Sequence, residues 1–149
     1  MKKVIITGGK IVGQVVLLYA MPDSEMAVYP ELVMVDFREA VLTPNNKVWF
    51  MQRVPGRLEV GFNQLFEPLH VLVVDHEPDF DTDFWDVLDN KKNRERALAE
   101  WKKASRVVRA KVVFSIHGYL RHLGRSGQYK VSGENYFKKM YYNTNWDNV

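Results

Sequence analysis

A run of acidic side chains between residues 75 and 89 has the residue types and the spacing to bind a cation. The run holds seven carboxylates and no lysine or arginine. Carboxylates at alternate positions of a curved loop can converge on a hard cation, because Ca²⁺ and Mg²⁺ prefer oxygen ligands. The sequence therefore predicts a divalent-cation site as one candidate, and its ligands would be Asp75, Glu77, Asp79, Asp81 and Asp83.

Two known metal-binding patterns match this run in part. In a calcium-binding loop, Phe84 would stand where glycine is needed and Asn90 where a bidentate glutamate is needed. Residues 78–79 and 89–91 resemble the PD-(D/E)xK nuclease motif, whose acids hold Mg²⁺ and whose lysine stabilises charge at the attacked phosphate. The resemblance implies a metal-dependent phosphodiesterase or nuclease that uses Asp75, Glu77, Asp79 and Lys91. The alternative is a solvated acidic loop that caps helix N-termini.

The second half of the chain is rich in cations. Residues 1–90 hold 7 Lys+Arg against 14 Asp+Glu, whereas residues 91–139 hold 14 against 3. On one continuous helix, Lys102, Arg106 and Arg109 fall at i, i+4 and i+7 and share a face. Such a face suits a row of phosphates, because each neutralised phosphate releases a condensed counterion. The candidate residues for binding nucleic acid or a protein partner are Lys102, Lys103, Arg106, Arg109, Arg121 and Arg125.

This separation of charge has two other interpretations. The acidic run directly precedes the basic segment, so the two can neutralise each other within one subunit. Alternatively, the acidic segment of one copy meets the basic helix of another, which gives a heterologous homo-oligomer. Five aromatic residues lie among or after the cations and either stack on exposed bases or belong to the core. They are Tyr129, Tyr136, Tyr141, Tyr142 and Trp146.

Other catalytic motifs are incomplete. No frame through Gly8, Gly9 and Gly13 gives the G-x-G-x-x-G pattern of a dinucleotide site. The four histidines include no HExxH pair, and no G-x-S-x-G sequence occurs. Without cysteine, the chain has no thiol nucleophile, disulfide framework or Cys-ligated zinc site. The sequence therefore favours a protein without catalytic activity.

The first half of the chain has the pattern of β-strands. Residues 4–7 and 11–19 are apolar, β-branched runs separated by Gly8 and Gly9, a pair suited to the positive φ of a hairpin turn. Further strands are expected at 32–37, 47–53, 58–62 and 69–74. We expect the second and third of these to form a hairpin, and the last to be buried on both faces because it is continuously apolar.

After residue 75 the hydrophobic period becomes helical. Apolar residues recur three, four or seven apart on one stripe, which predicts a long amphipathic helix at about 90–123. Asp89 or Asn90 would cap this helix, and Gly118 could kink it. A short C-terminal helix would begin at Ser132.

The fold class follows from these elements. With 149 residues, 46% of them hydrophobic and 26% charged, the chain can form one domain, residues 1–149. We expect an α+β fold, in which a mainly antiparallel sheet or partly closed barrel from residues 2–75 packs against the helix at about 90–123 and the short C-terminal helix. An α/β fold is the alternative if Gly8 and Gly9 lead into a helix.

The expected function is that of a non-enzymatic binding or structural assembly protein. Its basic helical face would engage nucleic acid or an acidic protein surface, which includes another copy of the chain. The alternative is the metal-dependent phosphodiesterase or nuclease that uses residues 75–89, and a divalent cation is the one cofactor considered. No membrane partner is expected. The apolar N-terminal runs are too short or interrupted for a signal peptide, so we expect a cytoplasmic protein that is not secreted.

Overall fold

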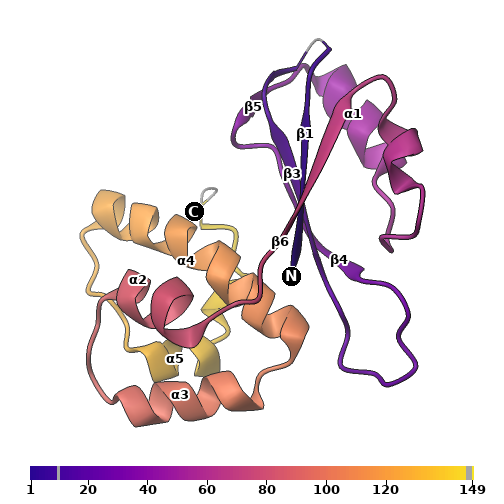
Figure 1. Cartoon of the computed structure of the whole chain (residues 1–149). Helices are drawn as coiled ribbons and strands as arrows, with labels where there is room; N and C mark the ends of the chain where they lie inside the picture. The colour runs from indigo at the N-terminus through magenta and orange to yellow at the C-terminus, as the bar shows by residue number, and fades with distance from the viewer. Residues whose placement is uncertain (10, 147–148) are drawn as a thin grey trace. The chain divides into compact units, whose positions relative to one another are not determined.

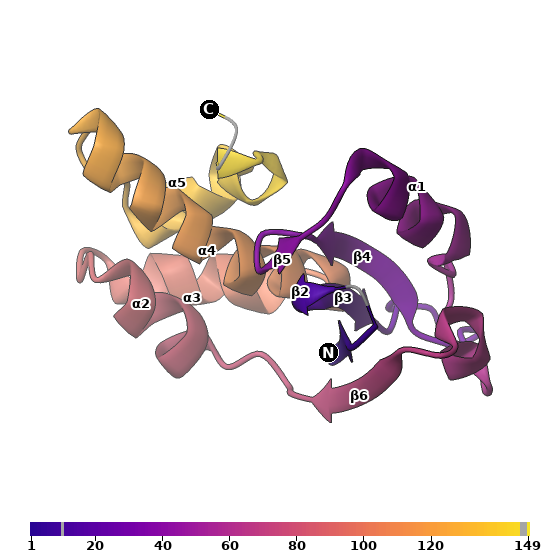
Figure 2. The same cartoon turned by 90° about the horizontal axis from the view of Figure 1, so that it is seen from above.

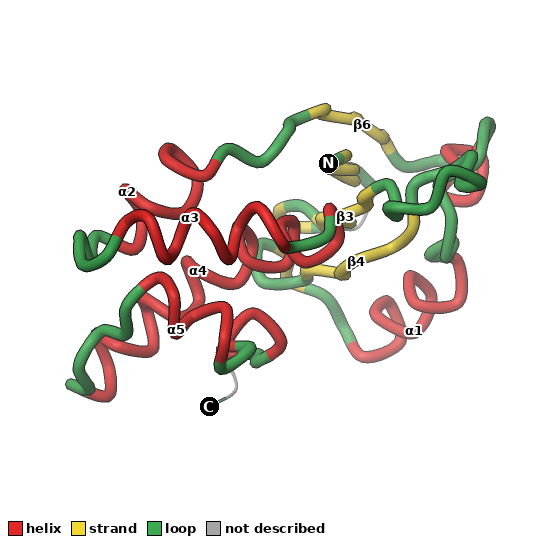
Figure 3. Tube along the Cα trace, turned by 90° about the horizontal axis from the view of Figure 1, so that it is seen from below, coloured by secondary structure: helices red, strands yellow, loops and turns green. Residues whose placement is uncertain are grey.

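The computed structural model describes residues 1–9, 11–146 and 149, and it divides into two compact units, Met1–His76 and Glu77–Val149 (Figure 1). All described strands lie in the first unit, and the second is made of helices and loops (Figure 3). The fold is α+β with antiparallel pairing, as expected, and the sheet is open and not a closed barrel. Each unit has its own hydrophobic core. That residues 1–149 act as one domain stays a prediction.

The main sheet has four antiparallel strands in the order β4-β3-β1-β6 (Figure 2). The Ile11 amide donates to the Gly8 carbonyl (3.1 Å) in the turn after the first strand, and Gly8 and Gly9 have φ of 97° and 59°. This confirms the hairpin and removes the α/β alternative. Residues 11–19, expected as one strand, form two. The strands are β1 (Lys2–Thr7), β2 (Val12–Gly13), β3 (Val15–Ala20), β4 (Glu31–Asp36), β5 (Ala40–Val41) and β6 (His70–Asp75).

The prediction of a hairpin over residues 47–53 and 58–62 is wrong. Helix α1 (Pro44–Arg53) replaces the first strand, because Thr43 caps the helix by accepting from the Asn46 amide (3.2 Å) and Pro44 suits its first turn. The second strand is replaced by a bend and by the 3₁₀ helix η1 (Phe62–Phe66). Phe50 of α1 and Phe66 of η1 stack at 6.2 Å in the core of the first unit. They cover the sheet face formed by residues such as Val4.

Strand β6 was expected to be buried on both faces, and this is also wrong. It pairs with β1 alone among the described strands, so it is an edge strand. Leu72, Val73 and Val74 are 60%, 40% and 41% exposed. A continuous apolar run therefore does not distinguish a central strand from an exposed edge, because strand order is decided by pairing partners distant in sequence.

The long helix expected at about 90–123 is two helices. Helix α3 ends at Lys103, Ala104 is extended (φ −68°, ψ 142°), and Ser105 caps α4 by accepting from the Val108 amide (3.1 Å). Helix α4 then passes through Gly118 without a break and ends before Gly127, whose φ is 68°. The helical elements of the second unit are η2 (Phe80–Trp85, a π-helix), α2 (Asp86–Leu88), α3 (Arg94–Lys103), α4 (Arg106–Ser126), α5 (Gly133–Lys138) and η3 (Tyr141–Asn143).

The core of the second unit is largely aromatic. Phe84 stacks on Trp101 at 6.3 Å and contacts Tyr136 at 5.8 Å. Helix α5 is capped by Ser132, as predicted, and its first residue, Gly133, lies so close to α3 that a Cβ there would be 2.9 Å from the Cβ of Ala97. The sequence placed Trp101 and Tyr136 in predicted helices but did not reveal that both pack against Phe84. Among the described residues, no helix combines the length and the apolar character needed to cross a membrane.

Candidate functional site

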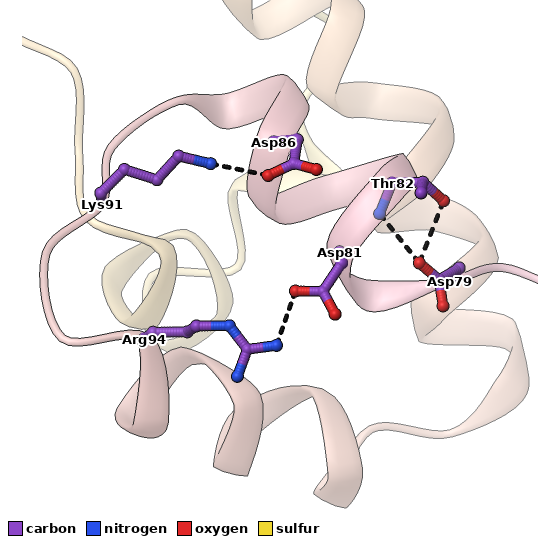
Figure 4. Close-up of polar contacts among 6 residues, drawn as sticks. All are labelled: Asp79, Asp81, Thr82, Asp86, Lys91 and Arg94. Carbon is purple, nitrogen blue, oxygen red and sulfur yellow. Dashed lines mark hydrogen bonds and ion pairs between the residues drawn. The ribbon is translucent and has the colours of Figure 1, made fainter.

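From Glu77 onward the acidic run belongs to the helical unit, and two of its carboxylates cap a helix there. Asp79 precedes η2 and accepts from both the amide and the hydroxyl of Thr82, at 2.8 and 3.0 Å (Figure 4). In return, the Asp83 carboxylate accepts from the Asp79 amide at 2.8 Å. This reciprocal pattern satisfies amides at the helix start that have no partner within the helix. Two of the five proposed cation ligands therefore already have a structural role.

Two further carboxylates of the run pair with the start of the basic segment. Asp81 accepts from Arg94 at 2.6 Å, and Asp86 accepts from Lys91 at 2.7 Å (Figure 4). All four side chains are about half exposed, so each pair contributes at most about 1 kcal/mol to stability. The acidic and basic segments thus partly neutralise each other within one helical unit, which was one of the interpretations of the charge pattern.

The proposed cation site gains no geometric support. Asp75 belongs to the first unit and pairs with Lys2 at 2.7 Å, and this hydrogen bond and charge hold the pKa of the Asp75 carboxyl below its ordinary value. In residues 1–9, 11–146 and 149, no three His, Asp or Glu side chains are arranged to hold a metal ion. Lys91, the charge-stabilising residue of the nuclease hypothesis, pairs with Asp86. The divalent cation and the nuclease activity stay untested hypotheses.

The basic face expected on one continuous helix does not exist in that form. Lys102 and Lys103 end α3, whereas Arg106 begins α4 after the extended Ala104. The helical spacing of these cations is therefore interrupted, although all three stay exposed and within five residues of one another. Lys103 pairs with Glu100 at 3.4 Å, and Lys102 has no ion pair in the described part of the chain. We call Lys102, Lys103 and Arg106 the junction cluster.

Arg109 was proposed as a binding residue, and the structure gives it a different contact. Its Nε donates to the Trp101 carbonyl at 2.9 Å, and one Nη donates to the Lys102 carbonyl at 3.2 Å. The guanidinium also lies 5.5 Å from the centroid of the Trp101 ring. Carbonyls in the last turn of a helix lack partners within the helix, so Arg109 satisfies the C-terminus of α3 from the first turn of α4.

Arg121 and Arg125 lie near the opposite end of α4. Both are exposed, and Arg125 donates to the Trp146 carbonyl at 3.0 Å. At 1.5 Å per residue, Arg121 is about 22 Å along the helix from Arg106. The predicted binding residues therefore form two groups, with the junction cluster at one end of α4 and this pair near the other.

Helix α4 also has a charge property that extends beyond the predicted binding residues. Its 21 residues contain five cations, including Lys111, and no Asp or Glu. The signal is present in the sequence, as a stretch without carboxylates between Glu100 and Glu134. Both ends of α4 lie inside this stretch, so the whole helix is free of carboxylates.

Most of the aromatic residues proposed to stack on bases belong to the core. Tyr136 is fully buried, its hydroxyl lies 2.7 Å from the Ser115 hydroxyl, and burial raises the pKa of the Tyr136 phenol. Tyr141, Tyr142 and Trp146 pack partly buried against the same cluster. Tyr129 is 99% exposed. It is therefore the member of the group that can stack on a base without disturbing the core.

Comparison with known proteins adds no relationship. No protein-family model, curated protein or solved structure matches the chain.

Proposed function

We propose that this protein is a non-enzymatic binding protein whose helical unit binds the phosphates of nucleic acid through the exposed cations of α3 and α4. The observation that carries the proposal is that α4, a 21-residue helix, has cations near both ends and no carboxylate. A polyanion can approach such a helix without repulsion from the helix's own side chains. Nucleic acid is a polyanion with regularly spaced charges, and exposed lysine and arginine are its usual partners.

The junction cluster is the centre of the proposed surface. Lys102 has no ion pair to break among the described residues, and the pair of Lys103 with Glu100 is long, at 3.4 Å, with an exposed ammonium group. Ser105 and Arg109 fix the backbone between α3 and α4, so the cluster stands on an ordered turn. Such an arrangement supports contacts to the phosphate backbone, and the exposed Tyr129, which follows the far end of α4, is a separate surface on which a base can stack.

An acidic protein surface, which includes another copy of the chain, is the alternative partner. The location that we propose is the cytoplasm, because a chain without cysteine is compatible with a reducing compartment.

The test is the salt dependence of binding to labelled duplex and single-stranded oligonucleotides, measured by fluorescence anisotropy. The triple variant Lys102→Ala/Lys103→Ala/Arg106→Ala should bind more weakly. On duplex, its plot of log K against log salt should be less steep by about 2.7, because each lost phosphate contact removes about 0.9. Between about 50 and 200 mM salt, wild-type affinity should then fall about 40-fold more than that of the variant.

The matched control removes the same net charge from the first unit. Lys3, Lys47 and Arg57 are exposed there, so the control is Lys3→Ala/Lys47→Ala/Arg57→Ala. The control should keep the wild-type slope. Equal weakening of both variants would show general attraction and contradict the assignment to the helical unit. A wild-type protein that binds neither oligonucleotide would refute the proposal and direct attention to an acidic protein partner.

A further inference from the structure

At the β6 edge of the main sheet, some backbone groups are paired with no described strand. The His76 amide donates to the Met1 carbonyl at 2.8 Å, so residues 1 and 76 form a hydrogen-bonded antiparallel pair. Bonded and non-bonded pairs alternate along such a ladder. The backbone groups of Leu72 and Val74 therefore point toward β1. Those of Val71, Val73 and Asp75 point away from the sheet, where no described strand receives them.

The β6 edge lacks most of the features that usually protect an edge strand, and its one carboxylate, Asp75, lies at the end of the strand and pairs with Lys2 at 2.7 Å. Residues 70–75 contain no proline and no lysine, and their pairing with β1 is regular over six residues. Four consecutive residues, Val71 to Val74, are apolar. Exposed edges of this kind are templates for pairing with another chain.

The other edge, β4, is protected by comparison. The β3–β4 ladder has a register shift at Leu18/Tyr19, and Glu31 at the start of β4 forms a bridge with Arg57. At its end, Asp36 is held by Arg38 at 2.9 Å. A bulge, charges and a covering segment all discourage pairing at β4. Of the two edges of the main sheet, β6 is therefore the less protected.

We propose that β6 pairs with β6 of a second copy of the chain, antiparallel and about a two-fold axis, to join two sheets into one. Because the outward backbone groups belong to odd-numbered residues, only registers that set these residues opposite each other can form. With the axis at Val73, Val73 faces itself and Val71 faces Asp75 of the second copy. An axis at Asp75 would place two carboxylates opposite each other, which is unfavourable.

The side chains also suit self-pairing in this register. Leu72 of one copy lies opposite Val74 of the other, and both are substantially exposed on one sheet face. The pairing therefore matches apolar residues with apolar residues over residues 72–74, whereas each Asp75 lies opposite Val71 and well apart from the other Asp75 carboxylate. A six-residue strand is about 20 Å long and gives a small interface, so the dimer should be weak and depend on concentration.

Sedimentation of the full chain from about 10 µM to about 1 mM tests this assignment. The average mass should rise from 17.4 kDa toward twice that value. The measurement is made at high salt, where contacts between acidic and basic surfaces are screened but strand pairing is not. Failure of nucleic-acid binding thus leaves this result unaffected. A wild-type protein that stays monomeric, or that grows beyond a dimer, overturns the proposal.

Two variants and one control identify the surface. Val73→Pro removes an outward amide without breaking the β1 ladder, and Leu72→Lys places a charge at an exposed edge position. Both should stay monomeric, and circular dichroism verifies that they fold. Val60→Lys is the control, because Val60 is an apolar residue that is 97% exposed and outside the strand. It should dimerise like the wild type. Dimerisation of Leu72→Lys at wild-type strength contradicts the assignment, whatever happens to Val73→Pro.

Discussion

Replacement of Arg109 by lysine separates the charge of this residue from its geometry. The guanidinium donates two hydrogen bonds to the last turn of α3, at 2.9 and 3.2 Å, and lies against the Trp101 ring. A lysine keeps the positive charge near that turn but cannot present two donors in a fixed fork. We therefore expect Arg109→Lys to destabilise the helical unit while its net charge stays the same.

The expected loss combines two contributions. A hydrogen bond from a charged group is worth about 1.5–3 kcal/mol, and a cation–aromatic contact about 0.5–1 kcal/mol when exposed. Arg109 is half-buried, and lysine recovers one bond together with the interaction with the helix dipole. The net loss should be about 1–2 kcal/mol in the free energy of unfolding. For a unit of this size, the unfolding temperature should fall by about 5–10 °C.

The assay is urea unfolding followed by tryptophan fluorescence. Trp49 lies in the first unit, whereas Trp85, Trp101 and Trp146 lie in the second. In a Trp49→Phe background, the emission therefore reports on the helical unit alone.

Arg96→Lys is the matched control for this prediction. The Arg96 guanidinium is exposed and, within the described part of the chain, pairs with Glu134 alone, at 4.0 Å, so the exchange should change stability by less than about 0.5 kcal/mol. An Arg109→Lys protein as stable as this control would refute the argument that Arg109 caps α3. Under the proposed function, Arg109→Lys should still bind oligonucleotides almost normally, because its charge is retained.

Two other predictions concern the packing and the electrostatics of the same unit. Gly133→Ala should lower the unfolding free energy by about 1–3 kcal/mol, because the new Cβ would lie 2.9 Å from the Cβ of Ala97. The control is Gly124→Ala, whose new Cβ enters open space in α4. This control should stabilise the helix by about 0.5–1 kcal/mol. Equal effects of these two variants would contradict the close contact between α5 and α3. The pKa of Glu134 is lowered in the folded protein, mainly by the hydrogen bond from Lys138. The stabilisation due to this carboxylate is therefore present above the pKa that Glu134 has in the unfolded chain. It is lost as the pH falls through the lower pKa of the folded state. The stability difference between wild type and Glu134→Gln should therefore shrink on acidification from pH 7, and a difference independent of pH in urea titrations would argue against the pair.

Local signals in the sequence determined several elements of this protein. The two glycines after β1 permit the positive φ of a tight turn, so the hairpin is fixed by residues adjacent in the chain. Ser132 caps α5 in the same local way. Thr43 and Pro44 are an equally local signal for α1, and the strand pattern of residues 47–53 obscured it. The break between α3 and α4 was missed for a related reason, because the apolar stripe continues in phase across Ser105.

Tertiary structure alone decided which of these elements and charges meet. The exposed position of β6 follows from its pairing with β1, about seventy residues away. The same apolar pattern can occur in a central strand and in an edge strand, so the pattern alone does not predict this position. Likewise, the sequence shows which residues are charged but not what they contact. In the folded chain, Asp79 caps a helix, Asp81 pairs with Arg94, and Arg109 donates to the end of α3. The net charge of a segment is the sum of the charges of its residues, so it can be read from the sequence. The partner of each charge depends on where the backbone brings it, and long-range packing sets that position.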